Sequence, residues 1–327
     1  MRRNILLLSL IFTVICGTVT HAQEFQSIKT ASRGENPYKA QMQHIKDSVN
    51  PMLKTEWGQN HPYNLFTPLV PGKNTHTKTG CVATSMAQVM KYYEFPKQAK
   101  DVVNYQYVGD DGKQHSISAD LTQSIYEWDK MDNSYQATTD EEHQKAVAQI
   151  MYDCGVSVKM QYGAVYSGAF DMDVPNAMIK HFSYDENITY MSRVFDENMT
   201  DEKWFSTLYQ QLSDGMPVIY GGLTGSYQAH SFVIDGYNKN GEFHIVWGFG
   251  DKGGYYNLDE ISYQHGHSMV INIKPETSTD IKSPQSTEAP HEIRRFSIDG
   301  ISISAPQPGI NLIQMSDGST KKVFILN

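Results

Sequence analysis

Apolar residues recur at helical spacing in three stretches of the first two thirds of the chain. We predict a buried amphipathic helix that starts at Cys81 and ends before Pro96, because apolar residues recur there every three or four positions. A second helix is predicted between a capping box headed by Thr139 and a closing Gly155, and a third over residues 201–212. The apolar face of the first helix consists of Val82, Met86, Val89 or Met90, and Tyr93.

Beyond Pro217 the pattern changes to short runs of alternating apolar and polar residues, which are typical of strands. This order, with helices first and antiparallel strands after them, predicts the α+β class. The predicted strands are 218–220, 231–235, 242–247, 255–258 and 269–273.

The two ends of the chain differ in character from the part between them. Residues 1–22 combine early positive charge, an apolar run and small residues at the end, which predicts a secretory signal peptide. Residues 23–42 are polar and aperiodic, and we interpret them as a short pro-segment or leader. A globular domain is predicted over 43–275, a linker rich in Pro, Ser and Thr over 276–293, and a small β tail of two or three strands over 294–327.

Composition argues against two classes of protein. Mean hydropathy of −0.48 excludes an integral membrane protein, and a formal net charge of −9 gives no electrostatic drive toward nucleic acid. The three cysteines, at positions 16, 81 and 154, are too few for a disulfide scaffold and lack the Cys-x-x-Cys spacing of a zinc or redox site. We therefore expect no metal and no other cofactor.

Cys81 is the candidate nucleophile. It occupies the first turn of the first predicted helix, where the helix dipole and free backbone N–H groups stabilise a thiolate, so a lowered thiol pKa is expected. The N–H groups of Cys81 and Val82 are candidates for an oxyanion hole, and Gly80 leaves room for a substrate backbone. Cys154 ends a helix among apolar neighbours and is interpreted as a core residue, so we expect no disulfide between the two.

His230 is the candidate base among the twelve histidines. It opens a predicted strand whose hairpin turn lies at 237–241, and folding the hairpin about that turn places Phe249 opposite His230 and Trp247 one pair further in. The aromatic residues are expected to shield the imidazole. His244 lies in the middle of the returning strand, where a structural role is expected.

These motifs together resemble the streptopain family of secreted bacterial cysteine proteases, a papain-like group, over roughly residues 43–275. The separation of about 150 residues between the cysteine and the histidine is similar to that in papain-like proteases. The segments that carry the resemblance are 64–68 (NLFTP), 79–93 (TGCVATSMAQVMKYY), 155–158 (GVSV), 229–236 (AHSFVIDG), 247–250 (WGFG) and 253–259 (GGYYNLD).

The resemblance implies a papain-like fold, with a helical subdomain that carries Cys81 as nucleophile and a β subdomain that carries His230 as general base and acid. It implies an endopeptidase that favours a hydrophobic side chain two residues before the cut. Trp247 would pack beside the histidine, and the glycine-rich stretch 248–254 would form a mobile loop at the cleft. Gly248, Phe249 and Gly250 are accordingly the supporting cleft residues.

The sequence departs from the pattern of that family at several positions. Val246 stands where streptopain-like sequences usually have Asn, so its side chain cannot orient His230. Phe249 replaces a second Trp, and Thr75 stands where papain-type enzymes have the glutamine that serves as oxyanion donor. The leader of about 20 residues is short beside the large folded propeptide of streptopain-type enzymes, so inhibition by a bulky prodomain is not expected here.

Two other functions stay open at this point: another Cys-His acyl-transfer enzyme (an amidase, transglutaminase or cell-wall peptidase), or a non-catalytic binding protein on the same fold. The expected partners are protein or peptide substrates and a proteinaceous inhibitor, and no nucleic acid. We expect the protein to be a secreted monomer without a membrane span.

Anchoring as a lipoprotein through Cys16 is disfavoured, because Ile15 occupies the position of a small residue. The pair His265 and His267 is interpreted as loop residues, and the β tail as a packed appendage or a sorting signal.

Overall fold

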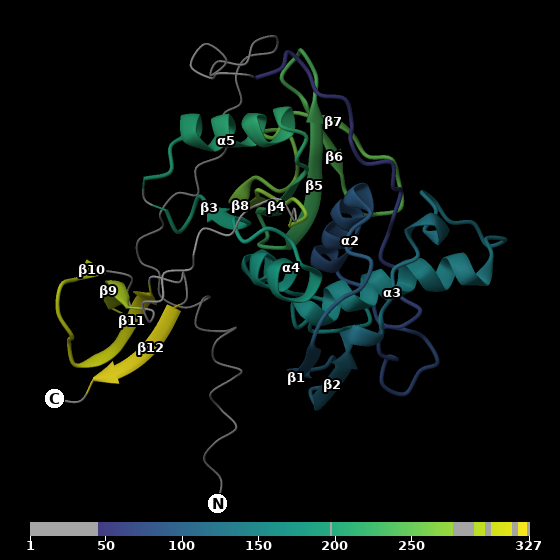
Figure 1. Cartoon of the computed structure of the whole chain (residues 1–327), viewed down its shortest axis with the longest axis horizontal. Helices are drawn as coiled ribbons and strands as arrows, with labels where there is room; N and C mark the ends of the chain where they lie inside the picture. Colours follow the sequence, from purple (N-terminus) through teal and green to yellow (C-terminus); the bar gives the residue numbers. More distant parts are fainter. Residues whose placement is uncertain (1–44, 197, 277–290, 298–301, 316–319, 326–327) are drawn as a thin grey trace, which may run out of the picture. The chain divides into compact units, whose positions relative to one another are not determined.

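A six-stranded antiparallel sheet in the order β3-β8-β4-β5-β6-β7 lies at the centre of the first of two units in the computed structural model (Figure 1). The structure describes residues 45–196, 198–276, 291–297, 302–315 and 320–325, and its two units divide between Thr277 and Ser278. The strands of this sheet are β3 (Thr189–Ser192), β4 (Val218–Leu223), β5 (Ala229–Tyr237), β6 (Phe243–Val246), β7 (Gly254–Tyr256) and β8 (His265–Ile271).

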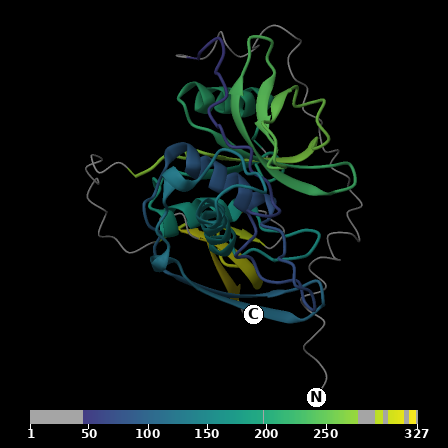
Figure 2. The same ribbon diagram turned by 90° about the vertical axis from the view of Figure 1, so that its right-hand side faces the viewer.

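The helices of the first unit precede most of these strands in the chain. Figure 2 shows the sheet and α5 on one side of the unit and the other helices, with a long β-hairpin, on the opposite side. The helices are α2 (Cys81–Tyr93), α3 (Glu141–Ser157), α4 (Val174–Phe182) and α5 (Asp201–Ser213), with short 3-10 turns η3 (Leu121–Gln123), η4 (Trp128–Lys130) and η5 (Asp171–Asp173). The hairpin pairs β1 (Val102–Val108) with β2 (Gln114–Asp120).

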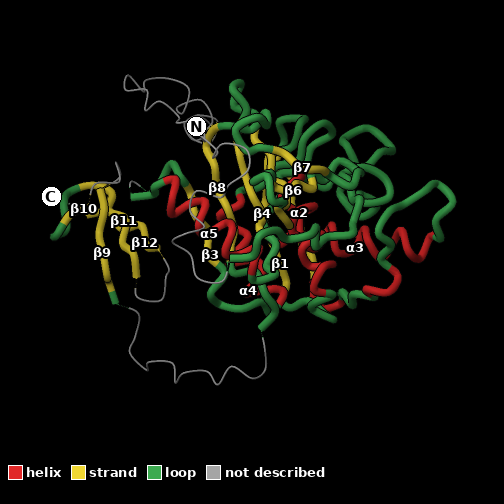
Figure 3. The backbone as a smooth tube through the Cα atoms, turned by 90° about the horizontal axis from the view of Figure 1, so that it is seen from above, coloured by secondary structure: helices red, strands yellow, loops and turns green. Residues whose placement is uncertain are grey.

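Both faces of the central strands β4, β5 and β6 are buried, because helices cover each face. Alternate residues of a strand point to opposite faces, and the two hydrophobic cores follow this period of two. Figure 3 shows the central strands side by side with α2, α3 and α4 grouped near them. Ile219, Val233, Val246 and Val270 pack into the core shared with α2 and α3, whereas Tyr220, Phe232, Ile234 and Ile245 pack into the core shared with α5.

The three predicted helices and five predicted strands are all present, with different ends in several places. The N-cap of α3 is Asp140, whose side chain accepts from the backbone N–H of Glu142, so the prediction of Thr139 as the cap was wrong. The helix also continues through Gly155 to Ser157, because its last turn is buried. The β1-β2 hairpin, α4 and β3 were not predicted from the sequence, and each is short: seven residues in each hairpin strand, nine in α4 and four in β3.

The second unit contains a four-stranded antiparallel sheet in the order β10-β9-β11-β12. This is more than the two or three strands that we predicted for the tail. Arg295 links two strands, since its guanidinium donates to Glu292 of β9 and to Asn311 of β11. The strands are β9 (Glu292–Ser297), β10 (Ser302–Ile303), β11 (Gly309–Met315) and β12 (Thr320–Ile325).

The predicted signal peptide over 1–22 and the predicted leader over 23–42 lie outside the described residues, as does most of the predicted linker. Among the helices that the structure describes, none has the length and apolar character needed to span a bilayer.

Gly80 is a glycine that the fold requires, which yields a first prediction. Its φ is +90°, and a Cβ would lie 2.6 Å from Sδ of Met160 and 2.9 Å from the carbonyl oxygen of Ser167. Gly80→Ala is expected to lower the free energy of unfolding by about 1–3 kcal/mol more than Gly72→Ala, because overpacking adds to the backbone strain. Gly72 is the matched control: its φ is +74°, but nothing lies within 4 Å of a Cβ there.

Urea unfolding monitored by circular dichroism measures both variants. Equal losses of stability in the two would show that only the positive φ matters and that the space beside Gly80 is not restricted.

Candidate active site

Cys81 lies at the first position of α2, as the sequence predicted. Backbone N–H groups of Ser231, Val82 and Cys81 itself act on its thiol and favour the thiolate. Burial has the larger effect in the opposite direction, and together with the nearby Asp171 carboxylate it raises the pKa of the Cys81 thiol to about 11. The expected lowering of the thiol pKa was therefore wrong, because desolvation of Sγ outweighs the helix N-terminus.

His230 is the second residue of β5, and only 6% of its surface is exposed. Its Nε2 lies 2.9 Å from the carbonyl oxygen of Trp247. A carbonyl can only accept, so Nε2 carries the proton of the neutral imidazole and Nδ1 carries the lone pair. Burial lowers the pKa of His230 to about 4, and the bond to Trp247 offsets part of this effect.

Aromatic rings surround the imidazole. Phe249 stacks on it with ring centroids 4.6 Å apart and an interplanar angle of 11°, and Tyr263 lies at 5.1 Å. The register of β5 against β6, in which Val233 pairs with Val246, continues toward this position. The prediction that Phe249 lies opposite His230 is confirmed. Phe249 itself is 59% exposed, so it is the outer wall of the imidazole site.

Val246 is a core residue, 1% exposed, and packs with Val233 on the face of the sheet that α2 covers. Its side chain thus belongs to the hydrophobic core, and the neighbouring main chain supplies the polar group in its place. The carbonyl of Trp247 orients the imidazole by accepting from Nε2. Sequence reasoning missed this acceptor, since every residue type has a carbonyl and nothing in the sequence marks this one.

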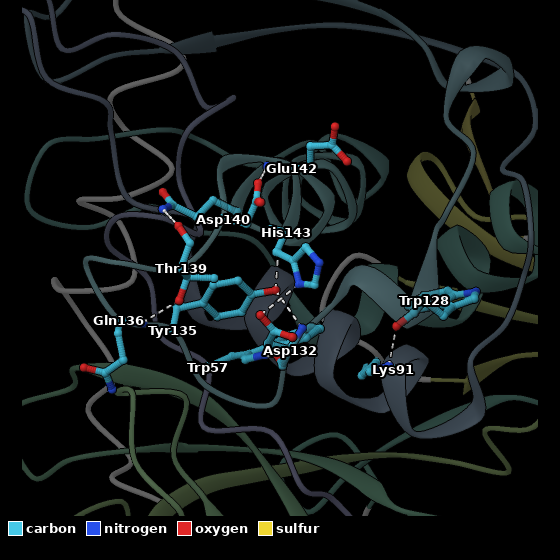
Figure 4. A network of polar contacts seen from close by, with 11 residues as sticks. Trp57, Lys91, Trp128, Asp132, Tyr135, Gln136, Thr139, Asp140, Glu142 and His143 are labelled. Atoms are coloured by element: carbon cyan, nitrogen blue, oxygen red, sulfur yellow. Dashed lines mark hydrogen bonds and ion pairs between the residues drawn. The ribbon is translucent and has the colours of Figure 1, made fainter.

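A hydrogen bond links the loop after β6 to the chain segment that precedes α2. Gly250 donates its N–H to the carbonyl of Trp57 at 3.1 Å, and Trp57 in turn donates its indole N–H to the carbonyl of Asp132 at 2.8 Å. Figure 4 shows the continuation of this network, in which Asp132 contacts the Tyr135 hydroxyl and the His143 ring. These hydrogen bonds connect the loop that carries Phe249 to Trp57 and Asp132.

Cys81 and His230, far apart in the sequence, line one cavity of about 250 Å³. Val82 and Ser231 belong to the same lining. Three exposed apolar side chains stand around it: Phe170, Met172 and Phe195, exposed by 61%, 50% and 75%. The remaining lining residues are Ala169, Asp171, Tyr190, Gly222, Leu223, Ala229, Gly266 and Ser268.

Cys154 lies inside α3 rather than at its end and is fully buried, and burial raises the pKa of its thiol well above the usual range. Both described cysteines are free. His244 Nδ1 lies 2.6 Å from Oδ1 of the buried Asp235, which is a structural pair.

His265 and His267 belong to β8, so their interpretation as loop residues was wrong. His267 is buried between the Tyr220 hydroxyl, 3.0 Å from Nδ1, and the Gln264 carbonyl, 2.8 Å from Nε2. Within the described ranges, no group of three or more His, Cys, Asp or Glu residues is arranged to hold a metal ion.

Comparison with known proteins gives a family match. Residues 57–256 match the peptidase C10 family. The chain belongs to that family. The predicted resemblance to the streptopain family is thereby confirmed.

Named relatives of this C10 family member are proteases. The chain is 29% identical over 245 residues to streptopain of Streptococcus pyogenes, covering 67% of this chain and 60% of streptopain. It is 32% identical over 252 residues to the thiol protease/hemagglutinin PrtT of Porphyromonas gingivalis, covering 71% of this chain and 28% of PrtT. The chain thus spans less than two thirds of the length of either relative.

The structure of active wild-type interpain A cysteine protease from Prevotella intermedia superimposes with a TM-score of 0.64 at 34% identity, covering 72% of this chain and 97% of that one. A fragment of prointerpain A gives the same TM-score at 31% identity, covering 82% and 81%. The predicted α+β, papain-like fold is confirmed by these likenesses and by the sheet and helices described above.

The burial of Val246 yields a second prediction. Val246→Asn is expected to lower the free energy of unfolding by about 1–3 kcal/mol, because it places an amide without a partner in the core. Val102→Asn, on the exposed side of β1, is the control and should change stability by less than about 0.5 kcal/mol. Urea denaturation compares the two. Undiminished stability of Val246→Asn would mean that an amide at this position finds a hydrogen-bond partner in the core.

Proposed function

We propose that this C10 family member is a secreted cysteine endopeptidase that cleaves proteins through Cys81 and His230. The observation that carries the proposal is the shared cavity: the thiol at the start of α2 and the imidazole near the start of β5 line it together. The neutral imidazole keeps the lone pair of Nδ1 for a proton, because Nε2 is held by the Trp247 carbonyl.

The reaction follows from these groups. His230 Nδ1 takes the proton of the Cys81 thiol, and the thiolate attacks the peptide carbonyl carbon to form a C–S bond. The N–H groups of Cys81 and Val82, which have no intrahelical acceptor at the first turn of α2, stabilise the oxyanion. His230 then gives its proton to the leaving amine as the C–N bond breaks. Water, deprotonated by His230, hydrolyses the thioester, and the thiol regains its proton.

The electrostatics favour a resting pair without charge. A thiol pKa near 11 and an imidazole pKa near 4 leave both groups neutral across the physiological range. The oxyanion donors and the Trp247 carbonyl are placed to stabilise the charges that form on the substrate oxygen and on the imidazole during the reaction.

The lining of the cavity supports a preference for a hydrophobic side chain two residues before the cut. Phe170, Met172 and Phe195 present apolar surface at its edge, where a substrate side chain can bury area. The predicted signal sequence supports export, and protein substrates follow from the proposed activity. The proposal includes that the protein is a monomer and that a proteinaceous inhibitor binds it.

A labelling experiment tests the nucleophile. Protein comprising residues 23–327 is treated with an epoxysuccinyl cysteine-protease inhibitor, and the adduct is located by mass spectrometry alongside a casein digestion. We expect one adduct, on Cys81 and not on the buried Cys154, because only Cys81 lines the cavity. In Cys81→Ala, labelling and casein cleavage should both disappear.

Two results would overturn the proposal. Labelling of neither cysteine with no casein cleavage would favour a binding protein. Labelling of Cys81 with cleavage of cell-wall peptides or amine transfer, and no casein cleavage, would favour another acyl-transfer enzyme.

The low imidazole pKa predicts the acid side of the pH profile. Protonation of His230 removes the base, so kcat/KM for a fluorogenic peptide should fall only as the pH drops through about 4 rather than through 6.5. Phe249→Ala should move this limb to higher pH, since water then reaches the imidazole and stabilises its charged form. Tyr166→Ala, at a 77% exposed aromatic residue, is the control and should leave the limb in place. A wild-type limb at pH 6.5 would contradict burial of the base.

A further inference from the structure

Asp171 is the single acidic residue in the lining of the cavity that holds Cys81 and His230, and the described lining contains no lysine or arginine. It begins η5, directly after the exposed Phe170. Asp171 lies in none of the segments that carry the family resemblance, so sequence reasoning did not select it. Its presence places a carboxylate in a cavity whose other walls are mostly apolar.

The two oxygens of the Asp171 carboxylate differ in their hydrogen bonding. Oδ2 accepts from the Ser268 hydroxyl at 3.1 Å. Oδ1 is shielded from solvent and has no hydrogen-bond partner among the described residues. Burial raises the pKa of Asp171, the hydroxyls of Ser231 and Ser268 offset part of this effect, and no cationic group does so. A buried carboxylate oxygen without a donor is unfavourable, so a ligand that brings a donor or positive charge gains the missing interaction.

The absence of a side chain at Gly221 leaves the space that the Asp171 carboxylate occupies. A Cβ on Gly221 of β4 would clash with Oδ2 of Asp171 and with Oγ of Ser268. Any larger residue at position 221 would therefore displace the carboxylate from its place beside β4 and β8. The position of Asp171 is thus defined by the sheet.

We propose that Asp171 makes this cavity a subsite for a lysine or arginine side chain of the substrate, in addition to the hydrophobic side chains proposed above. The apolar edge formed by Phe170, Met172 and Phe195 suits a long aliphatic stem, and the carboxylate suits the charged end of that stem. An aliphatic side chain fills the cavity but leaves Oδ1 unpaired. A basic side chain fills it and pairs the carboxylate.

The inference rests on the proposed peptidase activity, and peptides test it with the wild-type protein alone. In a quenched fluorogenic peptide, the residue two positions before the cut is valine, arginine or citrulline, and mass spectrometry confirms the cleavage site. Citrulline has nearly the shape of arginine without its charge. We expect kcat/KM to be at least tenfold higher for arginine than for citrulline, and equal values would overturn the proposal.

A matched pair of variants assigns the effect to Asp171. In Asp171→Asn the ratio of kcat/KM for arginine over citrulline should fall at least tenfold, because the amide removes the negative charge. Asp173→Asn is the control: it removes the same charge from the same 3-10 turn, but Asp173 is exposed and does not line the cavity. An unchanged ratio in Asp171→Asn, with the arginine preference intact, would assign that preference to another group.

The outcomes separate this inference from the proposed function. Cleavage of the valine peptide without any arginine preference overturns the role of Asp171 and leaves the peptidase intact. Absence of cleavage of all three peptides, together with an unlabelled Cys81, overturns the peptidase itself. Should Asp171→Asn fail to fold, the arginine and citrulline peptides still decide the proposal with the wild-type protein.

Discussion

The contact between α2 and β5 is the constraint on which the rest of the active site depends. One face of the sheet supplies Ile219, Val233 and Val246 to the core that α2 shares, and this burial fixes the helix against the strand. The start of the helix and the start of the strand then lie at one cavity, with Cys81 and His230 in its lining. Hydrophobic packing, without any direct bond between the two side chains, thus produces the pair.

The same packing sets the electrostatics of the pair. A helix N-terminus is worth up to about 1–2 kcal/mol to a negative charge, whereas desolvation of a charged group costs several kcal/mol. Burial therefore dominates both partners, raising the thiol pKa and lowering the imidazole pKa. A neutral resting pair is the physical consequence, and it places the stabilising N–H groups and the Trp247 carbonyl at the charges that form during reaction.

A backbone carbonyl, rather than a side chain, accepts the hydrogen bond that orients His230. Val246 points into the core, while the next residue presents its carbonyl to Nε2. The Trp57 carbonyl anchors the loop at Gly250, and Trp57 is itself held through Asp132. The imidazole is thus oriented by main-chain geometry that is independent of the side chain at position 246.

The sequence by itself determined the elements with strong periodicity or turn chemistry: the helix that begins at Cys81, the hairpin of β5 and β6, and through its register the position of Phe249 opposite His230. These features depend on residues that lie a few positions apart in the sequence, so the pattern of apolar and polar residues is enough to predict them. Only the tertiary structure decided the direction of the thiol pKa, the acceptor for Nε2 and the place of Asp171. Each of these depends on desolvation, on a backbone carbonyl or on a residue brought in from a 3-10 turn that is distant in the sequence, and none of them leaves a local pattern in the chain.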